Sequence, residues 1–203
     1  MKVKVCGITN INDALLCEST GADLLGFIFY EKSKRFINFE SAGLIINKLS
    51  FFTSKVGVFV NESADKINSV VDLLRLNAVQ LSGNEDPALA NKIAVPVIKS
   101  FRINENFDFD SINLFSNVTP LLDTYSASEY GGTGKRFNWN IIPEKIRSKI
   151  FLAGGISVQN IEEIFFSIKP FAVDLSSSLE NKPGRKDSVK VREFFKKINQ
   201  LRS

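Results

Sequence analysis

The sequence predicts one (β/α)8 (TIM) barrel domain over residues 1–203, a parallel eight-stranded barrel with outer helices. Eight short β-rich runs alternate with amphipathic stretches along the whole chain. Several runs are continuously apolar, as in parallel strands buried on both faces. Because a doubly wound open sheet typically has about five or six strands, a count of eight favours closure into a barrel.

The expected strands follow one another at the spacing of a repeated strand–helix unit. In chain order they are Lys2–Cys6, Asp23–Phe29, Ser54–Val60, Ala78–Leu81, Val95–Phe101, Thr119–Asp123, Lys149–Ala153 and Phe171–Asp174.

Helices between the strands are predicted by apolar residues at i, i+3, i+4 and i+7 spacing. The clearest sets are Ile67, Val70, Val71 and Leu74; Ile161, Ile164, Phe165 and Ile168; and Val191, Phe194, Phe195 and Ile198. Thr9, Ser63 and Ser157 are expected to cap the first, third and seventh helices.

Two helices are weakly patterned. The fifth, about Glu105–Phe115, lacks a clear period, and the sixth is a turn or two around Ile141–Ile146. The Gly-rich stretch Tyr125–Asn140 has no helical period and predicts a long loop. Long loops in compact domains are more often functional than idle.

Composition excludes several classes of function. The 26 basic and 22 acidic residues are dispersed, so no nucleic-acid surface is indicated. No apolar stretch approaches the roughly 18 residues of a membrane span. Two cysteines without a disulfide framework or metal spacing fit a reducing, cytoplasmic location. The chain has no histidine, so proton transfer must use Cys, Asp, Glu, Lys or Tyr.

Two clusters of small residues follow the last two expected strands. Gly154 and Gly155 come after strand seven, and Ser176, Ser177 and Ser178 come after strand eight. Glycine lets backbone N–H groups approach an anion closely, and serine adds hydroxyl donors. These loops commonly hold a substrate phosphate in such barrels, so we expect a phosphate site here.

Two side chains at other strand ends are candidates for proton transfer. Cys6 places a thiol at the same rim, and Gly7 after it allows close approach of a ligand. A free cysteine is also commonly a small core residue, which is how we interpret Cys17 in the first helix. Asp123 closes an apolar strand, where burial raises a carboxyl pKa toward that of a general acid. It would otherwise be a cap or turn residue.

The remaining rim residues suggest substrate contacts. Arg35 could bind a carboxylate through its planar guanidinium or belong to a solvated basic loop, and Gln80 and Asp174 stand at strand ends. The stretch from Tyr130 to Lys135 lacks the spacing of a nucleotide-binding P-loop. Its Gly131 and Gly132 suggest a flap over a ligand or a plain surface loop.

Taken together in this order, the motifs resemble the phosphoribosylanthranilate isomerase family of tryptophan biosynthesis. The matching segments are Lys4–Thr9, Gly26–Phe29, Ser33–Arg35, Val56–Asn61, Val79–Leu81, Leu122–Asp123, Gly131–Gly134, Leu152–Gly155 and Val173–Ser177.

The resemblance implies a (β/α)8 barrel that performs an Amadori rearrangement without metal or organic cofactor. Asp123 would be the general acid that opens the furanose ring, and Cys6 the general base that removes the C2 proton. Arg35 would meet the anthranilate carboxylate, and Asp174 would lie near the sugar hydroxyls. The loops after strands seven and eight would hold the phosphate of this small-molecule substrate. The chain would be a monomer or a homodimer.

Three departures from the family pattern concern binding. Ser82 replaces a usual histidine, Ser178 a usual glycine, and Lys34 a common proline. A positive φ at Ser178 would cost roughly 1 kcal/mol or more. Two alternatives stay open: another phosphosugar epimerase or lyase barrel, and a non-catalytic barrel that binds a phosphorylated ligand.

Overall fold

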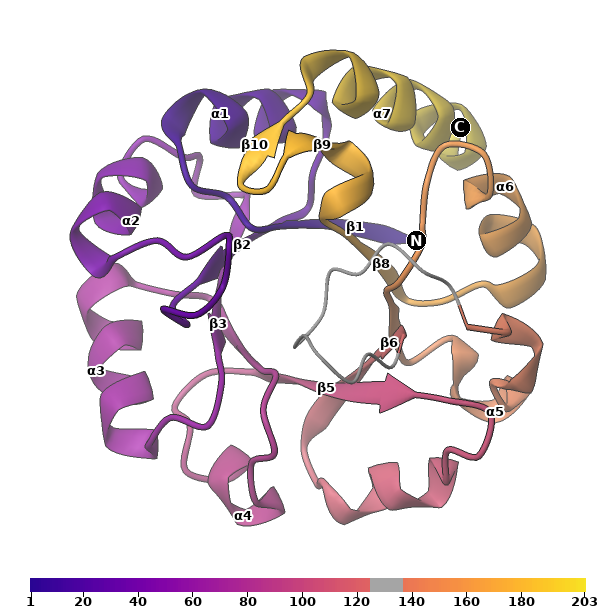
Figure 1. The fold of residues 1–203 in the computed structure, drawn as a ribbon, viewed down its shortest axis with the longest axis horizontal. Coiled ribbons are helices and arrows are strands. Elements are labelled where there is room, and N and C mark those ends of the chain that lie inside the picture. The colour runs from indigo at the N-terminus through magenta and orange to yellow at the C-terminus, as the bar shows by residue number, and fades with distance from the viewer. Residues whose placement is uncertain (125–136) are drawn as a thin grey trace.

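The chain folds into a closed barrel of eight parallel strands surrounded by helices, which confirms the predicted fold class (Figure 1). The computed structural model describes residues 1–124 and 137–203. Each strand pairs with its sequence neighbour, and β1 pairs with β8 to close the barrel. The strands are β1 Lys2–Cys6, β2 Leu24–Ile28, β3 Ser54–Phe59, β4 Ala78–Leu81, β5 Val97–Ile103, β6 Val118–Thr124, β7 Phe151–Leu152 and β8 Ala172–Leu175.

All eight predicted strands exist, but some boundaries differ. β5 begins and ends two residues later than predicted, because its pairing with β6 continues to Ile103 and Thr124. β7 has only two residues, and the backbone turns away at Gly154 and Gly155, whose φ angles are +83° and +67°. The extension of β5 brings Arg102 onto a strand and to the rim.

The helices cover the outside of the barrel, and α1 packs against α7 where the chain ends meet (Figure 1). The α-helices are α1 Ile11–Thr20, α2 Phe39–Ile46, α3 Ala64–Leu74, α4 Pro87–Ala90, α5 Glu144–Arg147, α6 Ile161–Glu163 and α7 Ser188–Arg202. The short 3-10 helices are η1 Phe109–Leu114, η2 Trp139–Ile141 and η4 Ser177–Leu179, and η3 Ile164–Ile168 is a π-helix. The two weakly patterned stretches thus form only short helices, η1 in one and η2 with α5 in the other, whereas the clearly patterned stretch 161–168 becomes the three-residue α6 followed by the π-helix η3.

One of the three predicted helix caps is confirmed. Ser63 caps α3 by accepting a hydrogen bond from the Lys66 N–H. The prediction for Thr9 is wrong, since Asn10 caps α1 and the Thr9 hydroxyl donates to the Gly184 carbonyl. The prediction for Ser157 is also wrong, because α6 begins after Asn160 and Ser157 donates its N–H to that side chain.

Alternation along the strands separates two apolar layers. Side chains such as Val3 and Val5 point outward and are fully buried against the helices. A second, smaller cluster fills the barrel interior, with Val56, Ile98 and Leu121 among its members. Cys17 lies in the outer layer, where burial raises its pKa to about 12, which confirms its interpretation as a core residue.

After β8 the chain forms an antiparallel hairpin that the sequence did not predict, made of β9 Glu180–Lys182 and β10 Arg185–Lys186 (Figure 1). Two of its charged side chains, Glu180 and Lys186, are buried. They reach the residues around β1 and the loop after β2.

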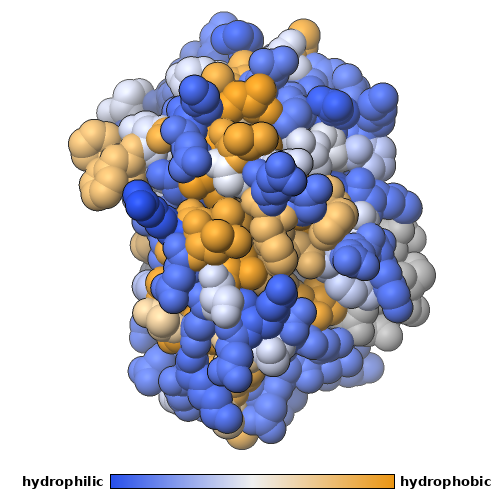
Figure 2. Space-filling view, turned by 90° about the vertical axis from the view of Figure 1, so that its left-hand side faces the viewer, coloured by the Kyte–Doolittle hydropathy of each residue, from blue (hydrophilic) through white to orange (hydrophobic). Residues whose placement is uncertain are grey.

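The surface carries exposed apolar residues. The side of the barrel formed by α2 and α3 shows an apolar area among polar residues (Figure 2), and its exposed leucines are Leu44 and Leu73. Phe51 and Phe52, between α2 and β3, are 88% and 90% exposed. Within the described ranges, no helix has the length and apolar character needed to cross a membrane.

Candidate active site

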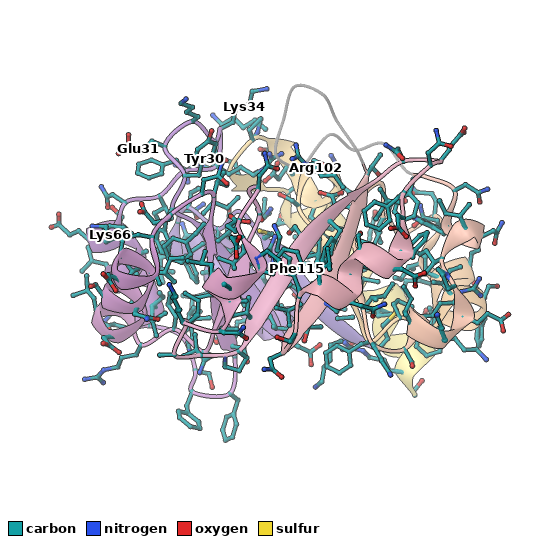
Figure 3. The ribbon with its side chains drawn as sticks, turned by 90° about the horizontal axis from the view of Figure 1, so that it is seen from below. Tyr30, Glu31, Lys34, Lys66, Arg102 and Phe115 are labelled. Carbon is teal, nitrogen blue, oxygen red and sulfur yellow. The ribbon has the colours of Figure 1, made fainter. Side chains whose placement is uncertain are left out.

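A cavity of about 450 Å³ opens at the C-terminal ends of the strands. Inward-pointing residues near the strand ends line it, including Cys6, Gln80, Asp123 and Asp174. Seen from the side, Tyr30, Lys34 and Arg102 lie toward the same end of the barrel (Figure 3). The volume is that of a typical small-molecule site.

The Cys6 thiol ends β1 and is almost completely buried at the cavity wall. Burial raises the pKa of this thiol, the cations of Lys4 and Lys186 act in the opposite direction, and the result is a pKa above the ordinary value. Cys6 is thus mostly a neutral thiol in the free protein, with two ammonium groups available to stabilise its thiolate.

Asp123 stands near the end of β6, across the mouth of the cavity from β1. Burial raises its pKa to about 6, although the carboxylate accepts a hydrogen bond of 2.7 Å from the Thr124 N–H. The nearby Asp174 carboxylate raises this pKa further. A carboxyl group that titrates near neutrality is suited to general acid chemistry.

Gly154 allows the loop after β7 to pass close to this acid. A Cβ on Gly154 would lie 2.3 Å from the Thr124 hydroxyl oxygen and 3.0 Å from Asp123 Oδ1. Its φ of +83° is also a backbone conformation that favours glycine. Gly154 is therefore required both for the turn and for the position of Asp123.

Asp174 lies on β8 between the two proton-transfer candidates and forms a buried ion pair with Lys4, at 2.9 Å between Nζ and Oδ1. Lys4 is completely buried, and it is not part of the cavity lining. Although burial alone would lower the pKa of Lys4, the charges of Asp174 and Cys6 raise it above its ordinary value. Lys4 therefore stays cationic beneath the cavity.

The predicted phosphate loops meet at one side of the cavity, where Gly154, Gly155, Ser176, Ser177 and Ser178 all contribute to its lining. The Ser176 hydroxyl is buried and has no hydrogen-bond partner among the described residues. Ser178 is absent from the residues with positive φ, so the strain considered for a serine at that position does not arise.

Gln80 belongs to a polar cluster on the opposite side. Its Nε2 donates to the hydroxyls of Ser82 and Ser100, both at 3.0 Å. Its Oε1 is buried and accepts no hydrogen bond from the part of the chain that the structure describes. Ser82, which stands where the family usually has histidine, thus orients Gln80 toward the cavity.

Arg35 lines the cavity, but one edge of its guanidinium is already occupied. Nε and Nη2 bind the Glu180 carboxylate, with Nη2 to Oε2 at 2.8 Å. Glu180 also accepts from Lys186 Nζ at 2.9 Å. Although burial alone would raise it, these cations hold the pKa of Glu180 below its usual range.

Three glycines, Gly7, Gly131 and Gly132, are predicted to contact the ligand. Gly7 is not among the residues that line the cavity, and its role in ligand approach stays a prediction. With φ of +77°, it leaves space for the Arg35 side chain, whose Cδ would lie 2.6 Å from an added Cβ. Gly131 and Gly132 lie outside the described residues.

Sequence reasoning missed three charged residues of this region. Arg102 lines the cavity from β5 and donates to Asn84 Oδ1 at 2.6 Å. Continuing the two-residue alternation of β5 past Ser100 would have found it. Glu180 and Lys186 had no such signal, because the hairpin that carries them has no apolar pattern.

Comparison with known proteins identifies the family of the chain. Residues 3–197 match the family model described as N-(5'phosphoribosyl)anthranilate (PRA) isomerase. The chain is 46% identical over 202 residues to the N-(5'-phosphoribosyl)anthranilate isomerase of Trichlorobacter lovleyi, with 98% of each chain covered.

Two solved structures are similar over nearly their whole length, each with a TM-score of 0.87, 38% identity, and coverage of 98% of this chain and 99% of the other. One is a phosphoribosyl anthranilate isomerase in complex with reduced 1-(o-carboxyphenylamino)-1-deoxyribulose 5-phosphate. The other is described as monomers of the dimeric enzyme from Thermotoga maritima. The match over almost the entire sequence shows that the chain belongs to the N-(5'-phosphoribosyl)anthranilate isomerase family.

Proposed function

We propose that this protein catalyses the Amadori rearrangement of N-(5-phosphoribosyl)anthranilate to 1-(2-carboxyphenylamino)-1-deoxyribulose 5-phosphate in tryptophan biosynthesis. The observation that carries the proposal is one cavity that combines an acid with a pKa of about 6, a thiol, and two anion-binding loops. Every step is a proton transfer, and acidic and basic side chains suffice for it.

Asp123 acts first, as the general acid. A carboxyl group with a pKa of about 6 is protonated in a useful fraction of molecules near neutrality. It gives its proton to the furanose ring oxygen while the bond from that oxygen to C1 breaks, and the nitrogen lone pair forms the imine. The product of this step is an open-chain iminium with a 4-hydroxyl group.

Cys6 acts second, as the general base. Its thiolate removes the proton from C2, and the electrons of that C–H bond form the C1–C2 double bond of an enolamine. The positive charge on nitrogen is neutralised in the same step. Tautomerisation of the enolamine, with proton transfer to C1, then gives the ketone.

The remaining lining residues bind the ends of the substrate. Gly154, Gly155 and Ser176–Ser178 hold the phosphate, and the Ser176 hydroxyl, which has no partner among residues 1–124 and 137–203, supplies one donor. Arg35, which lines the cavity, meets the anthranilate carboxylate through its guanidinium. Asp174 and Gln80 Oε1 accept hydrogen bonds from the sugar hydroxyls, and within the described part of the chain Gln80 Oε1 has no other donor.

Loss of phosphoribosylanthranilate fluorescence after addition of purified protein tests the reaction. We expect Asp123→Asn to lose at least about 10²-fold in kcat/KM, and Cys6→Ser to lose a similar factor. Asp72→Asn on α3 and Cys17→Ser in the core are the matched controls and should keep parental kcat. Full activity in Asp123→Asn or Cys6→Ser would disprove the assigned roles, and an inactive parent would favour a phosphate-binding barrel.

We also propose a cytoplasmic protein that is a homodimer rather than a monomer. Cys6 and Cys17 are both free thiols, as favoured by a reducing compartment. Phe51 and Phe52 protrude at the N-terminal end of the strands, opposite the cavity, and two adjacent exposed phenylalanines suit a partner surface. Light scattering should give twice the chain mass, and Phe51→Glu with Phe52→Glu should halve it without loss of activity. A monomeric parent would contradict the dimer.

A further inference from the structure

Lys4 is a buried cation that the proposed proton transfers do not use. It lies on β1 two residues before Cys6, so both side chains point into the barrel. Lys4 is 0% exposed and its ammonium pairs with Asp174 at 2.9 Å. A buried ion pair is weak evidence for stability, because removing two charges from water offsets their attraction. The pair therefore needs another explanation.

The Cys6 sulfur is the second neighbour of the Lys4 ammonium. Gly26 on β2 pairs with Cys6, and a Cβ on Gly26 would lie 2.8 Å from Cys6 Sγ and 3.2 Å from Lys4 Nζ. Both atoms thus lie beside the space that the missing Cβ leaves. Glycine at this position brings the thiol and the ammonium together.

The charges around the thiol come from four strands. The ammonium groups of Lys4 on β1 and Lys186 on β10 lower the pKa of the thiol, and Asp174 on β8 raises it. Burial raises the pKa of Asp174, and the Lys4 ammonium opposes that shift. Asp123 on β6 interacts with Asp174 and Lys4. Of these groups, Lys4 pairs with a carboxylate and also lies beside the sulfur, on the glycine side of β2. Asp174 keeps Lys4 charged while the thiol is neutral, so the ammonium is in place before the thiolate forms.

We propose that Lys4 is a positioning residue that supplies the positive charge for the Cys6 thiolate from beneath the cavity, with Asp174 as its standing counter-ion. This rests on the proposed function of Cys6 as the base. When the thiolate takes the C2 proton, it becomes a neutral thiol and the C–H electrons go to the enolamine. Lys4 keeps all its protons throughout and does not touch the substrate.

Alkylation of Cys6 by iodoacetamide tests the proposal without substrate, because only the thiolate reacts. The rate is measured against pH in a Cys17→Ala background, with mass spectrometry to locate the adduct. We expect Lys4→Met to move the midpoint upward by about one pH unit or more, which is a tenfold loss of thiolate at a given pH. The matched control is Lys2→Met on the same strand, since Lys2 is 57% exposed and pairs with Asp23 at the surface. Its midpoint should equal that of the parent.

A second pair of variants covers the case in which Lys4→Met does not fold. Asp174→Asn keeps the cation, and Lys4→Met with Asp174→Asn removes both buried charges together. The double variant should have a higher midpoint than Asp174→Asn alone. Equal midpoints in that pair, or a Lys4→Met midpoint equal to the parent, would overturn the proposal. Because the readout is thiol ionisation, a protein that fails to turn over phosphoribosylanthranilate would count against the proposed function and leave this result intact.

Discussion

Substitution of Gly154 by alanine should damage both the fold and the acid. A non-glycine residue at a φ of +83° costs roughly 1–2 kcal/mol in backbone strain. The new methyl group would lie 2.3 Å from the Thr124 hydroxyl oxygen, and forcing such a contact apart costs about 1–3 kcal/mol more. We therefore expect a loss of about 2–5 kcal/mol in the free energy of unfolding.

Activity should fall further than stability alone explains. The same methyl group would lie 3.0 Å from Asp123 Oδ1, so relief of the clash displaces the acid. A displacement of about 1 Å in a catalytic group costs on the order of 10²-fold in rate. Initial rates from phosphoribosylanthranilate fluorescence should show this loss in kcat/KM under conditions where the variant is fully folded.

Gly21 offers a matched control for this test. It follows α1 with a φ of +112°, and the nearest atom to an added Cβ is 3.7 Å away. Gly21→Ala therefore carries the backbone strain without the clash and should lose only about 1–2 kcal/mol, with parental activity. Urea unfolding of both variants separates the two contributions. If Gly154→Ala were no less stable than Gly21→Ala and fully active, the close contact with Asp123 would have no functional role.

The buried carboxyl groups make stability depend on pH. Because the pKa of Asp123 is raised from 3.8 to about 6, the folded state binds this proton more tightly and loses up to about 3 kcal/mol as pH rises from 4 to 8. The neutral Asp123→Asn should gain that much stability relative to the parent across this range in urea unfolding, and a constant difference would contradict the raised pKa. Glu180→Gln leaves Arg35 and Lys186 without their anion and should cost about 3–5 kcal/mol at pH 7, whereas the exposed Glu162→Gln should cost under about 1 kcal/mol. Since the pKa of Glu180 is lowered, the gap between Glu180→Gln and the parent should narrow as pH falls below about 4.5, and a gap independent of pH would refute the charge pairing.

The barrel and most of its rim could be predicted from the order of sequence patterns. Eight strand patterns alternating with helical ones leave few topologies, because connections between parallel strands are right-handed and strand ends converge on one face. That rule alone placed Cys6, Asp123 and the two small-residue loops around one cavity before any contact was known. Local sequence also predicted the start of a helix correctly where a single residue was the clear candidate for the N-cap, as Ser63 is for α3.

Local sequence did not predict the N-cap where two neighbouring residues could both serve, or the end of a strand where that end depends on pairing with the next strand. Thr9 and Asn10 are both good caps, and the contact of Thr9 with Gly184 of the distant hairpin leaves the cap to Asn10. β5 reaches Arg102 because β6 continues beside it, which no property of β5 alone reveals.

Tertiary structure alone decided the charge network beneath and beside the site. Arg35 meets Glu180 from 145 positions away, Lys4 meets Asp174 from 170, and Lys186 meets the Cys6 carbonyl from 180. A sequence does not distinguish a buried charged residue from a solvated one. Only a charged side chain that is removed from water requires a partner of opposite charge. The spacing of the motifs was therefore sufficient to predict the reactive residues at the rim. The charged partners that shift their pKa values depend on which charged side chains the closed barrel buries side by side.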